Sequence, residues 1–434
     1  MLKKIIGTSA TRVFNAAANF FLLWLATNYL GSTAWGLSGI ILLDISLILL
    51  VADMAGNAIV YFTPRRKVSS LLLISIVWSV MIVAALGLIF MALQAFPEFF
   101  SIIVPTGYAI HILVLVLIAS FNGFIINVLL GKGNILVFNS LFVVQMVAML
   151  LAMSYFIFIL NQRDETAFVG AMYVSYLITF LLGLVMIINV LRHDSIKENA
   201  TLKEMLHFGL MTQLSSITHL LNKRLGFYFI RNISGFGALG VYHSGTQVTE
   251  GLRIIGQSIA LVQMSAISNS NDKQYAKVLT LQLLKLSVLL TFLGVLMIAF
   301  IPTSFFTHFF GKDFGEIKTV FIFLSPGVIA LSANAIFSHF FSGIGIPKYN
   351  FYASIVGLLI IVPSVIILVP AFGIEGAAGS TSLAYLSAIV YQWSVFQKTT
   401  QTKGSELLLN REDLKFIRLL VQKVINRSRE SKQS

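Results

Sequence analysis

Long apolar runs recur along the chain from Ile5 to about Trp393, and short polar segments separate them. We count twelve runs, each at or above the roughly 20 residues that a helix needs to cross a bilayer. The runs are too long, and too rich in Leu, Ile, Phe and Gly, for barrel strands, which alternate over about ten residues. Helices are the remaining way to satisfy the backbone in lipid. The sequence therefore predicts an all-α polytopic membrane protein. The predicted spans are 5–29, 36–62, 69–94, 107–130, 136–160, 167–191, 205–231, 238–264, 278–301, 319–342, 349–370 and 373–397.

Two short glycine patterns recur at matching places and suggest a duplicated unit. The pattern N-x-x-G-x-x-A-x-G begins at Asn28 and again at Asn232, 204 residues later. A G-x-G motif follows the fourth run at 131–133 and the tenth run at 343–345. Glycine-rich turns resemble one another by chance, but these two patterns fall at the same place in each set of six runs. Because six is even, the halves would share one orientation about a pseudo-two-fold axis along the membrane normal. The predicted parts are a six-helix bundle over 1–200, a second over 201–400, and a tail over 401–434.

The distribution of charge predicts the orientation of the chain. Only 11% of the residues are charged, against about 25% in soluble proteins. With the N-terminus inside, the inner segments hold 21 of the 30 Lys and Arg residues and the outer loops hold three. This bias places both termini in the cytoplasm. The net charge of +13 therefore comes from loops and the tail, and we expect no nucleic-acid partner.

Both ends of the chain have distinct patterns. The start, MLKK before an apolar run, is similar to a signal peptide, but the run is too long and lacks a convincing cleavage site, so we interpret it as the first span. The tail from Ser405 predicts a basic amphipathic helix on the anionic inner leaflet, with a partner-binding helix as the alternative. Its apolar stripe consists of Leu414, Ile417, Leu420 or Val421, and Val424.

Polar side chains follow one face of the first span. Thr8, Arg12, Asn15 and Asn19 are spaced by 4, 3 and 4 residues, which places them on one side of a helix. Hydrogen bonds between helices, at about 0.6 kcal/mol each, would explain the asparagines. They explain Arg12 poorly, because an arginine at membrane depth costs at least about 2.5–3.5 kcal/mol unless it is hydrated or paired. We therefore expect this face to line a wet cavity.

The seventh and eighth spans carry more charge at depth. Lys223 and Arg224 are neighbours and point about 100° apart on a helix, so one of them is expected to face the cavity. Arg253 lies close to the middle of its span, and it is the strongest candidate for a substrate contact. A structural pair between Glu250 and Arg253 is the alternative. Gln247 shares this polar stripe.

The acidic groups within spans are fewer. Asp44 could balance Arg12 or bind a coupling cation, and Glu250 is a second candidate for ion coupling. Asp53 lies near the inner end of its span, where the simplest expectation is that it faces the cytoplasm. Five basic groups at depth outnumber three acids, which favours an anionic substrate such as a phosphate. The five are Arg12, Lys223, Arg224, Arg253 and Lys285, and the three are Asp44, Asp53 and Glu250.

No enzyme signature is present. The chain contains no GxxxxGK[ST], HExxH or GxSxG motif, and its outer loops are short. The absence of cysteine excludes disulfides and thiolate metal sites. We therefore predict no catalytic residue, no metal site and no cofactor. A glycan polymerase, which needs a large outer loop with charged residues, or a membrane scaffold stays the alternative from another class.

Three segments resemble the polysaccharide-biosynthesis (Wzx-type, O-antigen) flippase family. LVPAFGIEGAAGSTSLAY, at 368–385, is similar to the family's last pair of spans. The stretch 223–251, with Gly240-Val241-Tyr242 as its G-x-Y, and the segment LSPGVIALSANAIFSHFFSGIGIPKYN are similar to other parts of the family. The resemblance covers about residues 1–400. One departure is that the family commonly has R-x-D where this chain has Arg224-Leu225-Gly226.

The resemblance implies membership of the multidrug/oligosaccharidyl-lipid/polysaccharide (MOP) superfamily. It implies two six-helix bundles around a cavity, alternating access, and a polyprenyl-diphosphate-linked oligosaccharide as substrate. Arg12, Arg224 and Arg253 would then hold the diphosphate. We expect a flippase of the bacterial inner membrane that moves this lipid outward for surface polysaccharides such as lipopolysaccharide. Membrane lipids and glycan assembly proteins are its expected partners. A cation-coupled multidrug exporter of the same superfamily is the alternative, and it predicts an acidic cavity.

Overall fold

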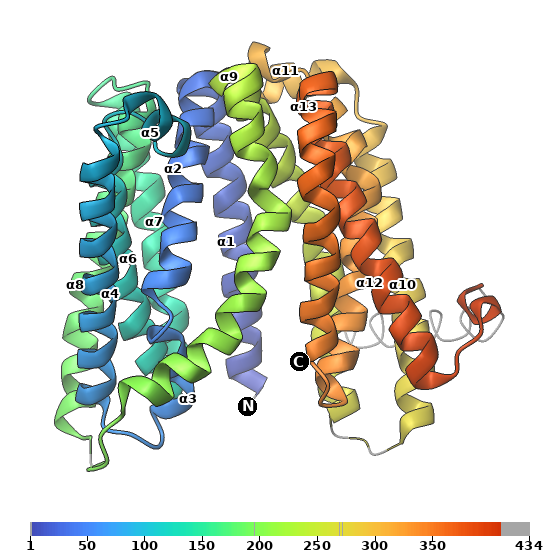
Figure 1. The fold of residues 1–434 in the computed structure, drawn as a ribbon, viewed down its shortest axis with the longest axis horizontal. Helices are drawn as coiled ribbons and strands as arrows, with labels where there is room; N and C mark the ends of the chain where they lie inside the picture. Colours follow the sequence, from blue (N-terminus) through green and yellow to red (C-terminus); the bar gives the residue numbers. More distant parts are fainter. Residues whose placement is uncertain (1, 195, 269, 271, 409–434) are drawn as a thin grey trace, which may run out of the picture. The chain divides into compact units, whose positions relative to one another are not determined.

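The structure is a computed structural model that describes residues 2–194, 196–268, 270 and 272–408. All regular structure in these residues is helical. Among these described residues, ten helices have 22 residues or more, and two of them, α9 and α13, break at one glycine, which gives twelve helical rods. Figure 1 shows how each runs. The long helices are α1 (Leu2–Tyr29), α2 (Gly31–Ala52), α4 (Val68–Leu93), α6 (Ala109–Gly131), α7 (Ile135–Phe158), α8 (Glu165–Arg192), α9 (Leu202–Ser268), α10 (Lys273–Ala299), α12 (Ile317–Gly343) and α13 (Lys348–Thr400). The short ones are η1 (Gly56–Ala58), α3 (Ile59–Phe62), α5 (Pro97–Ile103), α11 (Thr303–Phe310), η2 (Lys312–Phe314) and η3 (Gly404–Leu407).

The all-α prediction is confirmed, and most predicted spans match a rod to within a few residues. Within the described ranges, eight helices are by length and composition apolar enough to cross a bilayer. One prediction was wrong: the span expected at 36–62 ends at Ala52, and η1 and α3 follow it. Gly56 lies so close to the ring of Phe124 that an added Cβ would be 2.1 Å from it. The turn expected between the spans, at 232–237, is also shorter, because only Gly235 leaves the helical conformation.

The repeated glycines share a positive φ. Gly31 and Gly235, at the fourth position of the N-x-x-G-x-x-A-x-G pattern, have φ of 79° and 81°. Gly133 and Gly345, the last residues of the two G-x-G motifs, have φ of 76° and 80°. Side chains rarely adopt this left-handed region, so glycine is the residue that ends one helix and starts the next there. The two patterns therefore place glycines with the same sign of φ at matching positions, and the duplication itself stays a prediction.

The chain forms two compact units. Unit 1 comprises residues 1–245, 303–318 and 369–377, and unit 2 comprises 246–302, 319–368 and the chain from 378 on. In unit 1, helices α3, α4, α6 and α8 and the start of α9 pack around an apolar core that includes Leu71 and Phe124. In unit 2, α9, α10, α12 and α13 pack around Phe337, Phe340 and Phe396. The boundary that the sequence predicts near residue 200 concerns the repeat and stays a prediction.

In unit 2, a side chain of α13 bonds the backbone of α12 beside a proline. Pro326 lies inside α12 and has no backbone N–H to donate. Next to it, the Ser382 hydroxyl of α13 accepts from the N–H of Gly327 at 3.2 Å and donates to the carbonyl of Phe323 at 2.6 Å. The Ser382 hydroxyl therefore bonds two backbone groups on either side of the proline, and it ties α12 to α13 at this point.

A polar cluster ties together the loops of unit 1 near residues 66 and 194. The Arg66 guanidinium donates to both carboxylate oxygens of Glu204, at 3.0 and 3.3 Å, and pairs with Glu198 at 2.6 Å. The Asp194 carboxylate accepts from the Val68 N–H and from the Lys132 ammonium. Hydrogen bonds from Arg66 hold the pKa of Glu204 below its ordinary value. The cluster anchors the starts of α4 and α9 to each other.

Candidate functional site

The polar face of α1 contributes two asparagines whose side chains are described. Asn15 is half-buried, and its Oδ1 is buried. Asn19 is exposed, and its Nδ2 donates to the backbone carbonyl of Asn15 at 2.9 Å. The helical backbone extends through position 12, but the side chain of Arg12 lies outside the described residues. The role predicted for Arg12 therefore stays a prediction.

The first half of α9 carries two neighbouring cations. Lys223 and Arg224 are both half-buried. They lie about 17 Å before Gly235, at 1.5 Å per residue. Both positions are therefore far from the end of this helical rod. The Arg224 guanidinium stacks over the ring of Phe227, one turn further on, with 4.7 Å to the ring centroid. This cation–π contact stabilises one face of the guanidinium.

A row of rings continues from Arg224 into α2. Phe227 packs edge-on against His243, with centroids 5.4 Å apart, and His243 stacks on Trp35 at 4.7 Å and 13°. Trp35 in turn meets Phe168 of α8 edge-on. The imidazole of His243 is 3% exposed, and it lies where a side chain on Gly39 would have to be. His243 therefore helps to position Arg224 by packing.

The carboxylate of Asp44 is bound by a residue that the sequence analysis did not single out. Asp44 is 5% exposed, and its Oδ1 accepts a hydrogen bond of 2.5 Å from the Tyr228 hydroxyl of α9. Arg231, one turn further along α9, interacts electrostatically with Asp44. The Arg231 guanidinium also donates to the backbone carbonyls of Ser101 and Ile102. Asp44 thus belongs to a polar chain that joins α2, α5 and α9.

Asp53 also differs from its expected position. It ends α2 as the residue after Ala52, and its Oδ1 is buried. Its Oδ2 lies 3.8 Å from where a Cβ on Gly123 of α6 would be. The carboxyl is therefore packed against α6, and the simple expectation that it faces the cytoplasm was wrong.

The second half of α9 carries the remaining candidates, and it belongs to unit 2. Gln247, Glu250 and Arg253 are all half-buried. Thr249 is 2% exposed, and Gly256 packs on α12, where an added Cβ would be 2.7 Å from the Ser332 hydroxyl. Arg253 is one turn from each of these two residues, so it lies at the border of the buried face.

The predicted site residues thus divide between the units. Unit 1 holds Asn15, Asn19, Asp44, Lys223 and Arg224, and unit 2 holds Gln247, Glu250 and Arg253. The sequence analysis missed Phe227 and Tyr228. Their only sequence signal is the spacing from Arg224, which is i+3 for Phe227 and i+4 for Tyr228.

Comparison with solved structures identifies the fold. The chain is similar to the lipid II flippase MurJ in an inward closed conformation, with a TM-score of 0.69, 16% identity, and coverage of 94% of this chain and 89% of that chain. It is equally similar, at a TM-score of 0.69 and 17% identity, to a multidrug resistance MATE family transporter of the MOP superfamily in an inward-facing conformation, with coverage of 90% and 94%.

A third similar structure is a MOP superfamily transporter from Pyrococcus furiosus, with a TM-score of 0.63, 16% identity, and coverage of 92% and 96%. The chain has the fold of the MOP superfamily transporters. No family model matches it, and no curated protein matches it. The first two of these similar structures are a flippase and a transporter.

Within the MOP fold of this chain, a segment of the second half of the sequence packs in unit 1. This crossover segment, residues 303–318, meets the turn between α1 and α2. Asn28 donates to the carbonyl of Phe309 at 2.7 Å, and the Ser32 hydroxyl donates to the carboxylate of Asp313 at 3.2 Å. Phe20 packs on the rings of Phe309 and Phe310. The crossover segment therefore binds the end of α1 and the start of α2. We call these contacts the clasp.

Proposed function

We propose that this chain is a flippase that translocates a polyprenyl-diphosphate-linked oligosaccharide from the cytoplasmic to the outer leaflet of the bacterial inner membrane, for surface polysaccharide synthesis. One observation carries the proposal: α9 of a MOP fold holds three half-buried cations, Lys223, Arg224 and Arg253, inside its rods. Cations at such depth are costly unless they are hydrated or paired, and they commonly mark a substrate path.

The stacking of Arg224 on Phe227 suits the binding of a phosphate. A guanidinium that rests one face on a ring keeps its planar fork of N–H donors pointing sideways. Those donors make paired, charge-assisted hydrogen bonds with phosphate oxygens. In unit 1, Asn15 and Asn19 stay candidates for polar contacts, and in unit 2 Arg253 and Gln247 stay candidates for a charged and a polar contact. The polyprenyl chain would stay in lipid while the diphosphate and the sugars pass.

Alternating access would require the contacts of the crossover segment to open and close. Asn28 and Ser32 hold this segment through one hydrogen bond each, so the clasp can be released without breaking a covalent or metal link. Asp44 and Glu250 are the candidates for coupling the movement to an ion gradient. The inner-membrane location and the cytoplasmic termini belong to the same proposal.

A cation-coupled drug exporter is the second candidate, because the MATE transporter is as similar to this chain as MurJ, at a TM-score of 0.69 for both. For the Pyrococcus furiosus transporter, a reverse polarity of the binding pocket suggests a different function. Polarity is therefore the property that separates the two candidates. An exporter of cationic drugs needs acidic groups where the flippase needs Lys223, Arg224 and Arg253.

The test is flipping in proteoliposomes with a fluorescent polyprenyl-diphosphate oligosaccharide, measured as the fraction accessible to an outside quencher. We expect Arg253→Ala and Arg224→Ala to lower the rate at least tenfold, and Arg253→Lys to keep part of it. The matched control is Arg163→Ala, since Arg163 is exposed in a loop. Unchanged flipping in both variants would contradict the proposal. Export of cationic dyes by the wild type, without glycolipid flipping, would establish the exporter instead.

A further inference from the structure

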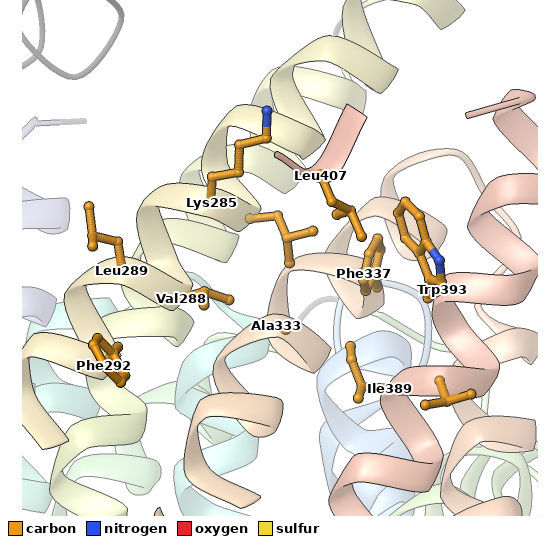
Figure 2. A pocket seen from close by; sticks show the side chains of 11 residues that line it. Lys285, Val288, Leu289, Phe292, Ala333, Phe337, Ile389, Trp393 and Leu407 are labelled. Carbon is orange, nitrogen blue, oxygen red and sulfur yellow. The ribbon is translucent and has the colours of Figure 1, made fainter. Parts of the chain in front are cut away.

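Unit 2 contains an apolar pocket of about 490 Å³ that the proposed transport does not use. Helices α10, α12 and α13 form its walls, and Leu407 of the segment after α13 closes one side (Figure 2). The volume lies in the roughly 300–1,000 Å³ range of small-molecule sites. Two lining residues are exposed, Val390 at 63% and Phe292 at 44%. The pocket is therefore accessible to an apolar chain from outside.

The pocket has one charged end. Figure 2 shows Lys285, Leu407 and Trp393 toward one end and Phe292 and Ile389 toward the other. Lys285 is 9% exposed, and its ammonium donates to the backbone carbonyl of Leu408 at 2.9 Å. The remaining lining is apolar apart from the indole N–H of Trp393. A hydrocarbon chain with an anionic end matches this distribution of polarity.

A short strap, residues 401–408, covers the charged end. Gln401 ends α13 in the left-handed conformation, and Glu406 then accepts from the backbone N–H of Lys403 at 2.8 Å. The Glu406 carboxylate also pairs with Lys277 of α10 at 2.9 Å, two turns before Lys285 on the same face of the helix. The strap thus places a carboxylate and a carbonyl oxygen on the two lysines, as an anionic headgroup would.

We propose that this pocket binds one acyl chain of an anionic phospholipid from the cytoplasmic leaflet, with the phosphate on Lys285 and the strap displaced. The cytoplasmic leaflet carries anionic lipids that attract lysines near its surface. Lys277 and Lys285 lie in the first half of α10, which the distribution of charge places toward that leaflet. This site is independent of the proposed flippase cycle. When the lipid is bound, the strap no longer covers Lys285.

The test is native mass spectrometry of the full chain with phosphatidylglycerol and with phosphatidylcholine of identical acyl chains. We expect phosphatidylglycerol to bind at least tenfold more tightly to the wild type. Lys285→Gln should remove this preference, whereas Lys203→Gln, in an exposed position of the same charge, should keep it. Equal binding of both lipids to the wild type, or an unchanged preference in Lys285→Gln, would overturn the proposal.

A second measurement keeps the test independent of variant folding. Phosphatidylglycerol with a photoreactive acyl chain should label wild-type peptides that contain Phe292, Ala333 or Val390, and Ala333→Phe should reduce that labelling by filling the pocket. Labelling only elsewhere would overturn the proposal. Competition by polyprenyl phosphate at lower concentration than phosphatidylglycerol would also overturn it, because the pocket would then hold the tail of the transported lipid.

Discussion

Gly36 and Gly240 lie against each other where α2 crosses α9, and the contact is reciprocal. A Cβ on Gly36 would be 1.9 Å from the carbonyl oxygen of Phe236, and a Cβ on Gly240 would be 1.9 Å from the carbonyl oxygen of Ser32. Ser32 and Phe236 are themselves 204 residues apart, as the two glycines are. A pseudo-two-fold axis through the crossing explains this exchange of partners.

Alanine at either crossing glycine should destabilise the protein. The added methyl overlaps a backbone oxygen, which cannot move aside as a side chain can, so the helices must separate. Overpacking of this kind costs about 1–3 kcal/mol. We expect Gly36→Ala and Gly240→Ala each to lower the melting temperature in detergent by several degrees. The control is Gly379→Ala, since nothing lies within 4 Å of its added Cβ. Equal melting temperatures for all three variants would argue against the close crossing.

A cross-link should hold the crossover segment closed. The chain has no cysteine, so Ser32→Cys with Asp313→Cys gives a single thiol pair at positions whose side-chain oxygens are 3.2 Å apart. We expect a short bifunctional thiol reagent to join them, with a shift in electrophoretic mobility after a cut in the loop between α9 and α10. If transport needs the clasp to open, the cross-linked protein should lose at least nine-tenths of its rate. When the reagent is a cleavable one, cutting the cross-link should restore the transport rate. Each single cysteine variant, treated with the same reagent, should keep its full rate.

The pair of Asp44 and Tyr228 should show strong energetic coupling. Tyr228→Phe removes the hydroxyl that donates to a buried carboxylate, and such a loss costs about 1–3 kcal/mol. In a double-mutant cycle with Asp44→Asn, we expect the two effects to be non-additive by about 0.5–3 kcal/mol. Tyr155→Phe, on an exposed ring, is the control. Additive effects in thermal unfolding would show that the two groups do not act together.

The loop cluster should make stability depend on acidic pH. Burial alone would raise the pKa of Asp194, but hydrogen bonds from Val68 and Lys132 outweigh it, so this pKa lies below its ordinary value. The carboxylate therefore stabilises the fold fully above an ordinary Asp pKa of about 3.9 and loses this effect as the pH falls through the folded-state pKa. Between pH 7 and pH 3, the wild type should lose more thermal stability than Asp194→Asn. Glu98→Gln, at an exposed position, should follow the wild type, and parallel curves for all three would contradict the assignment.

Hydropathy was sufficient for most of the fold because each rod crosses an apolar layer and carries its own signal. Hydropathy failed after Ala52. The residues that follow are still mostly apolar, but the long helix ends there and the chain continues as the short helices η1 and α3. The left-handed glycines were visible as repeats, since only glycine tolerates that conformation. Long-range contacts were not visible. Tyr228 is 184 residues from Asp44, and nothing local in the sequence relates a tyrosine to a distant carboxylate.

The reciprocal crossing also shows where the two halves have come to differ. Gly39 and His243 are 204 residues apart, so they occupy one position of the repeat, yet one is the smallest residue and the other fills the space beside it. Two imidazoles at these positions would compete for one space, whereas a single imidazole fills it and stacks on Trp35. The asymmetry between glycine and histidine is therefore what permits this tight fit.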